Sequence, residues 1–473
     1  MNTKSRRLSD VNTMIPLIVA LVLFMEFLDS SILNTAIPTI ARQFMQNPII
    51  LKFSVATYYI GLAVFIPISG FCTDKFGTKT VFIISILLFI LFSYLCTIAH
   101  NTAELSIFRF CQGVGGAIMN PAARIILMRK TLPQHLLKVQ AFVFSTALMG
   151  MLCGPIIGGI ITNYFAWEWI FYINIPIGVL CVILGIKYVE QSKSKVIPKF
   201  DYLGFVIVAT SLCCISIGTE FIGHFDIIPM QIIIALLILG LVLFIYLIYH
   251  CKNSKKPIFN FAVFNIKTFR IGFILNISIY LVTTAIPFML PLMFQECFKL
   301  SPMASGMLII PLVAGFVIGR REINILISKI GFRDTIFGAL MIQILGLLVF
   351  ANFNANTSFL FIIITEFIFG ISSVTLISST GALNYVDVPK IKVSQVTTVD
   401  ITARQFISSL SIGICSFSLI FFAHYFNLDL FASNAKTFNY TFYLFAVISS
   451  IGLINVSRLG KNDGEIALNK ESQ

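Results

Sequence analysis

Residues 51–100 read LKFSVATYYIGLAVFIPISGFCTDKFGTKTVFIISILLFILFSYLCTIAH. They contain two apolar runs, 51–72 and 80–100, that are joined by a short polar loop around Asp74 and Lys75. Each run is long enough to cross about 30 Å of hydrocarbon as a helix. Because backbone N–H and C=O groups must find partners inside their own segment in lipid, such runs predict a bundle of transmembrane helices.

The same pattern recurs along the 473 residues, of which 58% are hydrophobic and 11% charged. Soluble domains are about one quarter charged, so lipid is the expected solvent. The longest polar stretches, 188–202 and 458–473, are too short to bury a core, which places the function inside the membrane. Fourteen spans are predicted, at 14–36, 51–72, 80–100, 104–124, 139–162, 168–187, 203–222, 229–250, 270–294, 304–320, 334–352, 358–383, 397–423 and 438–457.

The basic residues test this topology, because Lys and Arg concentrate in cytoplasmic loops and each missed span would invert every later loop. Most of the 33 Lys and Arg fall on the side that contains both termini. The exceptions are Arg42, Lys52, Lys299 and Lys436 on the other side, with Arg109 and Arg404 within or at the edge of spans. We expect cytoplasmic N- and C-termini and a bacterial inner membrane. The net charge of +13 lies between spans rather than on one face of a domain, which does not indicate a nucleic-acid binder.

The predicted organisation has two halves, because Gly70–Lys79 after the second span resembles Ile327–Asp334 at the corresponding place later in the chain. Transporters built from repeated halves show such internal similarity. The predicted segments are a cytoplasmic N-terminus 1–13, a six-helix bundle 14–187, a linker 188–202, two inserted helices 203–250, a linker 251–269, a six-helix bundle 270–457 and a cytoplasmic tail 458–473.

The loop motif Gly70-x-x-x-Asp74-x-x-Gly77-x-Lys79 resembles the conserved cytoplasmic loop of the major facilitator superfamily. The resemblance implies two six-helix bundles that rock about a central cavity, here with two extra helices between them. Glycines permit a tight reversal, and Asp74 can cap a helix or pair with a base across the two halves. Thr78 stands where the family usually has Arg, and an ordinary basic turn is the alternative interpretation.

Glycines recur every four residues at Gly150, Gly154 and Gly158, next to Pro155 and Gly159. Such a face carries no side chains, so another helix can approach it closely. The stretch resembles the motif of the exporting, antiporter branch of the superfamily. Because Gly315 and Gly319 repeat the spacing, we expect these two helices to pair across the halves. Glycine packing without relevance to transport direction is the alternative.

The first span contains Phe27-Leu28-Asp29 and, farther on, Asn34-Thr-Ala-Ile-Pro38, which together resemble the signature of the fourteen-span drug:proton antiporters. The stretches Trp167-x-Trp169-Ile-Phe-x-Ile-Asn174 and Arg404-Gln405 resemble the same family. Burial favours the protonated form of a carboxyl group, so Asp29 can exchange a proton near neutral pH. Glu26 lies on the same helix face and can titrate with it. The alternative is a packing hydrogen bond from Asp29 to Asn34 or a neighbour.

Two further charged residues inside spans are site candidates. Arg109 belongs to Leu105-x-x-x-Arg109-x-x-Gln112-Gly113, which resembles the fourth-helix motif of the superfamily, and Glu366 lies in the middle of span 358–383. A charged side chain in hydrocarbon is costly unless it is paired or hydrated, so such residues are functional candidates. Arg109 is otherwise a partner for backbone carbonyls, and Glu366 is otherwise a residue that reaches water at a cavity wall.

These features predict a proton-coupled exporter of lipophilic or cationic drugs that works by alternating access, with small-molecule substrate, protons and the lipid bilayer as its partners. Neither a nucleotide-binding motif nor a catalytic or metal-ligand constellation occurs in the sequence, so no enzyme activity and no cofactor are expected. An exporter of one physiological solute, such as a metabolite, organic anion or siderophore, remains the alternative. A periplasmic adaptor and an outer-membrane channel are candidate partners, and otherwise a monomer is expected.

Overall fold

The structure is a computed structural model in which residues 3–131, 133–192, 200–222, 228–254, 257–389, 392–427 and 435–460 are described. Within these ranges every regular element is a helix, which confirms the predicted all-α fold class. The chain divides into two compact units, Met1–Ala209 and Thr210–Gln473. The dividing point lies inside α9 (Tyr202–Glu220), which is the first of the two predicted inserted helices.

The finer segment boundaries remain predictions. Parts of the predicted linkers 188–202 and 251–269, of the inserted pair 203–250 and of the tail 458–473 lie outside the described residues, as do residues 1 and 2 of the predicted N-terminus.

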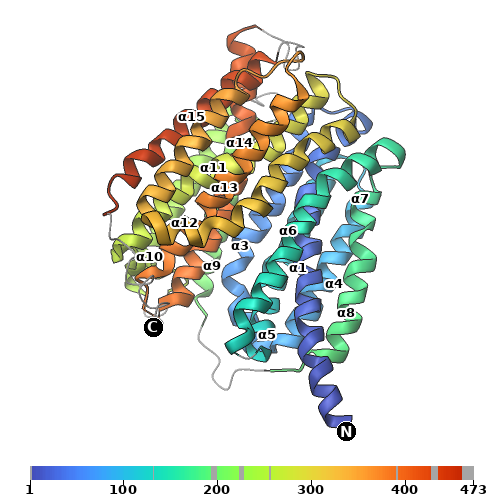
Figure 1. The fold of residues 1–473 in the computed structure, drawn as a ribbon, viewed down its shortest axis with the longest axis vertical. Helices are drawn as coiled ribbons and strands as arrows, with labels where there is room; N and C mark the ends of the chain where they lie inside the picture. The colour runs from blue at the N-terminus through green and yellow to red at the C-terminus, as the bar shows by residue number, and fades with distance from the viewer. Residues whose placement is uncertain are drawn as a thin grey trace. The chain divides into compact units, whose positions relative to one another are not determined.

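The first unit contains α1 (Thr3–Gln43), α2 (Pro48–Leu51), α3 (Phe53–Phe76), α4 (Thr78–Thr97), α5 (Thr102–Lys130), α6 (Pro133–Tyr164), α7 (Trp169–Tyr172) and α8 (Asn174–Tyr188). Helix α1 packs between α6 and α8 and also contacts α5 (Figure 1). Helix α5 packs against α3 and α4. Its start is capped by Asn101, whose side chain accepts from the Glu104 backbone N–H, while the Glu104 side chain accepts from the His100 N–H, each at 2.9 Å.

The second unit contains the end of α9, then α10 (Met230–Asn253), the 3-10 helix η1 (Phe261–Asn265), α11 (Lys267–Glu296), α12 (Pro302–Phe350), α13 (Phe359–Val386), α14 (Val393–Tyr425) and α15 (Lys436–Val456). Helix α11 packs against α13, α14 and α15, and α12 packs against α13 and α15. Ser301 caps α12 by accepting from the Ala304 N–H, and Pro302 stands at the first helical position.

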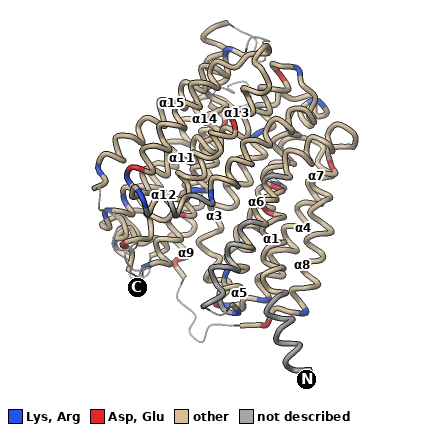
Figure 2. Tube along the Cα trace, in the orientation of Figure 1, with Lys and Arg blue, Asp and Glu red and all other residues tan. Residues whose placement is uncertain are grey.

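Twelve helical segments of the described residues are long and apolar enough to cross a membrane, and they coincide with twelve of the fourteen predicted spans. Figure 2 shows long stretches of these helices without a charged residue. The other two predicted spans, 104–124 and 139–162, lie in α5 and α6. Helix α5 carries Arg109, Gln112 and Asn120, and α6 offers a shorter apolar stretch, Met149–Tyr164. The count of fourteen therefore remains a prediction.

Two helices of the first unit approach each other through glycines. A Cβ atom on Gly61 of α3 would lie 2.3 Å from the Phe110 carbonyl oxygen of α5. A Cβ atom on Gly113 of α5 would lie 2.3 Å from the Tyr58 carbonyl oxygen of α3. Each glycine therefore faces the carbonyl three residues before the other glycine, and no larger residue fits at either position.

The same crossing occurs in the second unit. A Cβ atom on Gly315 of α12 would lie 2.2 Å from the Phe367 carbonyl oxygen, and one on Gly370 of α13 would lie 2.1 Å from the Leu312 carbonyl oxygen. The offset of three residues is repeated as well. This repeated geometry gives the internal similarity seen in the sequence a structural counterpart.

The turns after these crossings also correspond. Gly77 between α3 and α4 has φ 90° and ψ 146°, and Gly331, at the break inside α12, has φ 80° and ψ 171°. A positive φ is unfavourable for residues with a Cβ atom, which explains glycine at both turns. Because of this break, α12 supplies two of the candidate spans, 302–320 and 329–350.

The expected pairing of the two glycine faces is wrong. Cβ atoms on Gly315 and Gly319 would meet Phe367 and Val374 of α13, in the second unit. The glycines of α6 face α1, in the first unit. A four-residue spacing indicates that a helix has a flat face but not which helix covers it, so the sequence pattern could not select the partner.

The glycine crossing in the second unit can be tested with matched alanine substitutions. Gly370→Ala forces α12 and α13 apart and should lower the free energy of unfolding by about 1–3 kcal/mol. Gly338→Ala is the control, because its Cβ would meet nothing within 4 Å and alanine is otherwise the better helix former. Thermal unfolding of the purified variants in detergent measures both. Equal stability of the two variants would contradict the crossing.

Candidate functional site

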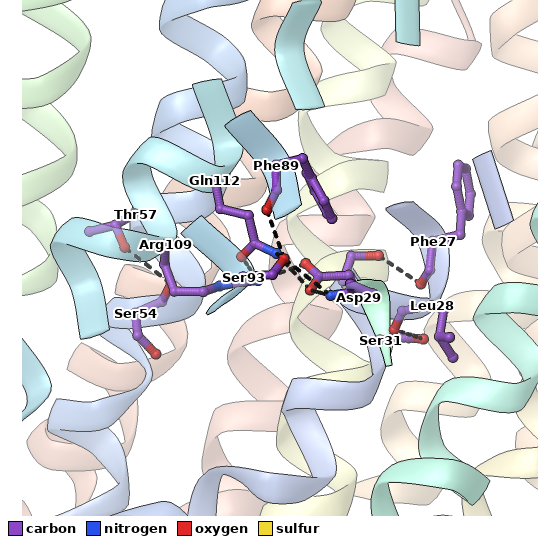
Figure 3. Close-up of polar contacts among 12 residues, drawn as sticks. Phe27, Leu28, Asp29, Ser31, Ser54, Thr57, Phe89, Ser93, Arg109 and Gln112 are labelled. Carbon is purple, nitrogen blue, oxygen red and sulfur yellow. Dashed lines mark hydrogen bonds and ion pairs between the residues drawn. The ribbon is translucent and has the colours of Figure 1, made fainter. Parts of the chain in front are cut away.

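Asp29 of α1 lies at the centre of a buried polar network in the first unit (Figure 3). Its Oδ2 forms an ion pair with Arg109 Nη1 of α5 at 2.6 Å. Its Oδ1 accepts from Gln112 Nε2 of α5 at 2.9 Å and from Asn174 Nδ2 of α8 at 2.6 Å. The carboxylate is therefore held by one cation and two amides that come from two other helices.

Ser93 of α4 extends the network. Gln112 Nε2 also donates to Ser93 Oγ at 2.7 Å, and Ser93 Oγ donates to the Phe89 carbonyl oxygen at 2.8 Å. Arg109 Nη1 donates to Gln112 Oε1 at 2.6 Å. The Gln112 amide thus joins Asp29, Arg109 and Ser93, and four helices meet at one ion pair.

Aromatic rings enclose the guanidinium of Arg109. Its Cζ lies 4.3 Å from the centre of the Tyr58 ring and 5.7 Å from the centre of the Phe171 ring, where the ring faces attract a cation. The side chains of Arg109 and Asp29 are both 0% exposed. Two opposite charges sealed from water stabilise each other, and removing either partner leaves the other as an uncompensated buried charge.

The network also contains unused hydrogen-bonding capacity. Among the described residues, Nε and Nη2 of Arg109 and Oδ1 of Asn174 are buried without a hydrogen-bond partner. An acceptor beside a carboxylate can receive a hydrogen bond once that carboxylate is protonated.

The antiporter-type motif of α6 seats α1 beside this network. Cβ atoms on Gly150, Gly154 and Gly158 would lie 2.4, 1.8 and 2.3 Å from atoms of Phe24, Ser31 and Thr35, respectively. These contacts bracket Asp29 along α1. Pro155 lies inside α6 and, like Gly159, is buried. The motif thus fixes the helix that carries the central carboxylate.

Glu26 of α1 has partners of its own. It is hydrogen-bonded to Asn120 and interacts electrostatically with Arg124, both on α5, and Arg124 Nε donates to Asn120 Oδ1 at 2.9 Å. Glu26 also interacts with Asp29. On α5, Asp29 thus has a basic and an amide partner, and so does Glu26. The two carboxylates lie about one helical turn apart on α1 and interact with each other.

The remaining two candidates lie apart from the Asp29 network. Asn34 is half-buried, and its Oδ1 has no hydrogen-bond partner among the described residues, so it does not bond to Asp29.

Glu366 belongs to the second unit, where its side chain is fully buried against the Leu312 backbone. Glu366 precedes Gly370 by four residues, as Arg109 precedes Gly113. It thus occupies in α13 the register position that Arg109 has in α5.

The loop motif is anchored by a residue outside it. Gln191 Oε1 accepts from the backbone N–H groups of Lys79 and Thr80 at 3.1 and 3.3 Å, and Gln191 Nε2 donates to the Phe76 carbonyl oxygen at 3.1 Å. A Cβ atom on Gly77 would lie 2.6 Å from the same side chain. The glycine therefore makes room for the segment that follows α8.

The other motif residues are placed as follows. Lys79 Nζ donates to the Ile186 carbonyl oxygen at 2.7 Å, whereas a Cβ atom on Gly70 would meet nothing within 4 Å. The first N–H groups of α4 donate to Ser192 and Gln191, so Asp74 does not cap that helix. A partner for Asp74 across the halves remains a prediction.

Sequence reasoning selected Asp29 and Arg109 as separate candidates but missed the residues that join them. Gln112 and Asn174 both stand in quoted motifs, and both are amides in otherwise apolar helices, which was the available signal. Ser93 gave no signal beyond its polarity. Tyr58 belongs to an aromatic-rich span, in which no pattern distinguishes the one ring that stacks on Arg109.

Comparison with known proteins identifies the family. The Major Facilitator Superfamily matches residues 19–412. "Probable transport protein HsrA" of Haemophilus influenzae is 31% identical over 95% of this chain and 96% of that protein. "Putative multidrug resistance protein MdtD" of Yersinia enterocolitica is 28% identical over 94% of this chain and 95% of that protein. The chain belongs to the Major Facilitator Superfamily, and it is a multi-pass membrane transporter rather than an enzyme.

A solved structure agrees with this assignment. The crystal structure of the nucleoside transporter NupG has a TM-score of 0.65 and covers 95% of this chain and 100% of its own, at 10% sequence identity. At this identity the likeness concerns the fold alone. The expected resemblance to the superfamily is confirmed, and the relatives named MdtD agree with the expected resemblance to drug transporters.

A double-variant cycle tests the ion pair independently of transport. Asp29→Asn leaves the Arg109 cation buried and should cost about 3–5 kcal/mol of unfolding free energy. Asp29→Asn combined with Arg109→Gln removes both charges and should be more stable than Asp29→Asn alone. Thermal unfolding of the purified proteins in detergent measures the difference. If the stability losses of Asp29→Asn and of Arg109→Gln, each measured alone, simply add in the double variant, the two residues are not paired.

Proposed function

We propose that this transporter is a proton-coupled antiporter that exports lipophilic or cationic compounds by alternating access, with Asp29 as its coupling residue. The observation that carries the proposal is the buried Asp29–Arg109 pair, held by Gln112 and Asn174. An ionised carboxylate sealed from water is stable only while its cation and amides stay in place. Protonation therefore changes the set of contacts that joins α1, α5 and α8.

Charge balance explains why proton and substrate would alternate. With Asp29 ionised, the pair carries no net charge, and binding of a proton leaves the Arg109 cation uncompensated. A positive site repels a cationic substrate, since like charges in a low-dielectric interior interact strongly. Loss of the proton restores neutrality and removes this repulsion. Proton binding on one side of the membrane can thus be linked to substrate release there.

The direction and energy source follow from other features. The glycine face of α6, which resembles the antiporter motif, packs along α1 beside Asp29. With no nucleotide-binding motif in the sequence, the proton gradient of the bacterial inner membrane is the proposed driving force, without a cofactor. Cytoplasmic termini belong to the same proposal, as do a periplasmic adaptor and an outer-membrane channel as candidate partners. The MdtD relatives are named for multidrug resistance, which supports this substrate class.

Export of one physiological solute remains the second candidate. The name of the 31% identical HsrA relative specifies transport but no substrate. Arg124 and Arg404 are basic side chains that are not fully buried, so either could contact an anionic solute. The same assay separates the two candidates.

The test is dye transport in everted membrane vesicles. Wild-type protein should move a fluorescent cationic dye in response to a pH gradient and dissipate that gradient in return. Asp29→Asn should do neither, because it loses the proton step and its uncompensated Arg109 cation lowers the affinity for a cationic dye. Asp387→Asn, which changes an exposed carboxylate after α13, is the matched control and should behave as wild type.

Two other results of the dye assay would contradict parts of the proposal. If wild-type protein moves no dye, the specific-solute alternative becomes the leading one, and anionic substrates are tested next. If Asp29→Asn transports normally at equal expression, Asp29 does not couple, and Glu26 and Glu366 are the remaining carboxylates to test.

A further inference from the structure

A second ion pair with a buried carboxylate lies in the second unit, and no sequence pattern assigned a role to that carboxylate, Asp400. Asp400 and Arg404 are one turn apart on α14 and form a salt bridge through Asp400 Oδ2. Asp400 Oδ1 accepts from Asn276 Nδ2 of α11 at 3.2 Å and from Asn384 Nδ2 of α13 at 3.0 Å. Three helices therefore meet at one carboxylate whose side chain is 1% exposed.

The arrangement repeats that of Asp29 atom by atom. In both networks one carboxylate oxygen takes the guanidinium and the other takes two amide N–H donors. A tyrosine ring lies beside the guanidinium in both, with Arg404 Cζ 5.4 Å from the centre of the Tyr280 ring. The two pairs do not occupy equivalent positions, because Asp400 belongs to α14 and Asp29 belongs to α1.

The amides of this second network have hydrogen-bond acceptors without a donor. Oδ1 of Asn276 and Oδ1 of Asn384 are both buried, and neither finds a donor among the described residues. Leaving a buried acceptor unpaired is unfavourable. A half-turn of either amide would bring its Oδ1 to the carboxylate, where a protonated Asp400 could donate to it.

The backbone of α11 lies close to one of these amides. A Cβ atom on Gly272 of α11 would lie 2.0 Å from Asn384 Oδ1, so glycine is the residue that accommodates the amide. The Arg404 side chain is 24% exposed, so the protein of this unit does not fully enclose the network on that side. Asp400 is thus a buried carboxylate with an accessible neighbour, two donors for its ionised form and two acceptors for its neutral form.

We infer that Asp400 is a second proton-binding residue, and that its proton is exchanged through the Arg404 side of the network. The use of this proton as a second coupling proton rests on the proposed antiport function. The titratable groups that interact with the pair from neighbouring helices are Tyr280 of α11 and Tyr385 of α13. In the described part of α15 no titratable group is seen to interact with it.

Infrared spectroscopy of the purified protein in lipid tests proton binding without any transport. The difference spectrum between acidic and alkaline buffer should contain a band from a protonated buried carboxyl group that is lost in Asp400→Asn. Asp400→Glu should restore such a band at a changed frequency. Asp387→Asn is the control. It removes an exposed carboxylate at the C-terminal end of α13 and should leave the band unchanged.

Arg404→Gln provides a second measurement that does not remove the carboxyl group. Because an opposite charge within about 4–6 Å favours the ionised form, its loss should move the midpoint of this band to higher pH by about 1–3 units. If Asp400→Asn fails to fold, this shift decides the question. A spectrum in which neither variant changes a band would overturn the inference, since Asp400 would then stay ionised throughout.

The transport assay separates this inference from the proposed function. If the Asp400 band is present but no variant of Asp29 affects dye transport, Asp400 binds a proton and the antiport proposal fails. If Asp29→Asn abolishes coupling but the spectrum shows no Asp400 band, the antiport proposal stands and the second proton site is wrong. If the antiport proposal and the Asp400 proton site both hold, Asp400→Asn should lower the number of protons exchanged per substrate by one.

Discussion

The first unit depends on keeping two opposite charges out of water without leaving either one alone. The idealised cost of moving one such ion into a medium of low dielectric constant is of order 20 kcal/mol, and several kcal/mol remain after relaxation. The Asp29–Arg109 contact at 2.6 Å offsets that cost only while Gln112 and Asn174 complete the coordination of the carboxylate. The positions of α1, α4, α5 and α8 are therefore coupled to the ionisation of one residue.

Glycines set the distances that make this coordination feasible. Helices in a membrane lack a hydrophobic driving force toward each other, so close backbone approach has to come from small residues. The Gly61–Gly113 crossing aligns α5 with α3, and the glycine face of α6 seats α1. The second unit repeats the crossing at Gly315 and Gly370. A common scaffold thus carries different chemistry, because Glu366 stands where α5 has Arg109.

The sequence predicted what local patterns determine. Apolar runs located the helices, and rare charges inside those runs selected Asp29, Arg109 and Glu366. The contact between Asp29 and Arg109 joins residues 80 apart in the chain, so only the packing of α1 against α5 could reveal it. The same polar residues that build the site make α5 too polar to qualify as a span by hydropathy. Asp400 was overlooked because its role comes from amides on two distant helices.

Proton release on substrate binding tests the central claim most directly, since it needs neither a membrane nor a gradient. Purified wild-type protein in weakly buffered detergent solution should release protons when a cationic dye binds, and a pH indicator reports their number. Asp29→Asn should bind the dye more weakly and, at dye concentrations that give equal occupancy, release at least one proton fewer than the wild type. If Asp29→Asn releases as many protons as the wild type at equal dye binding, Asp29 is not the residue that couples proton and substrate.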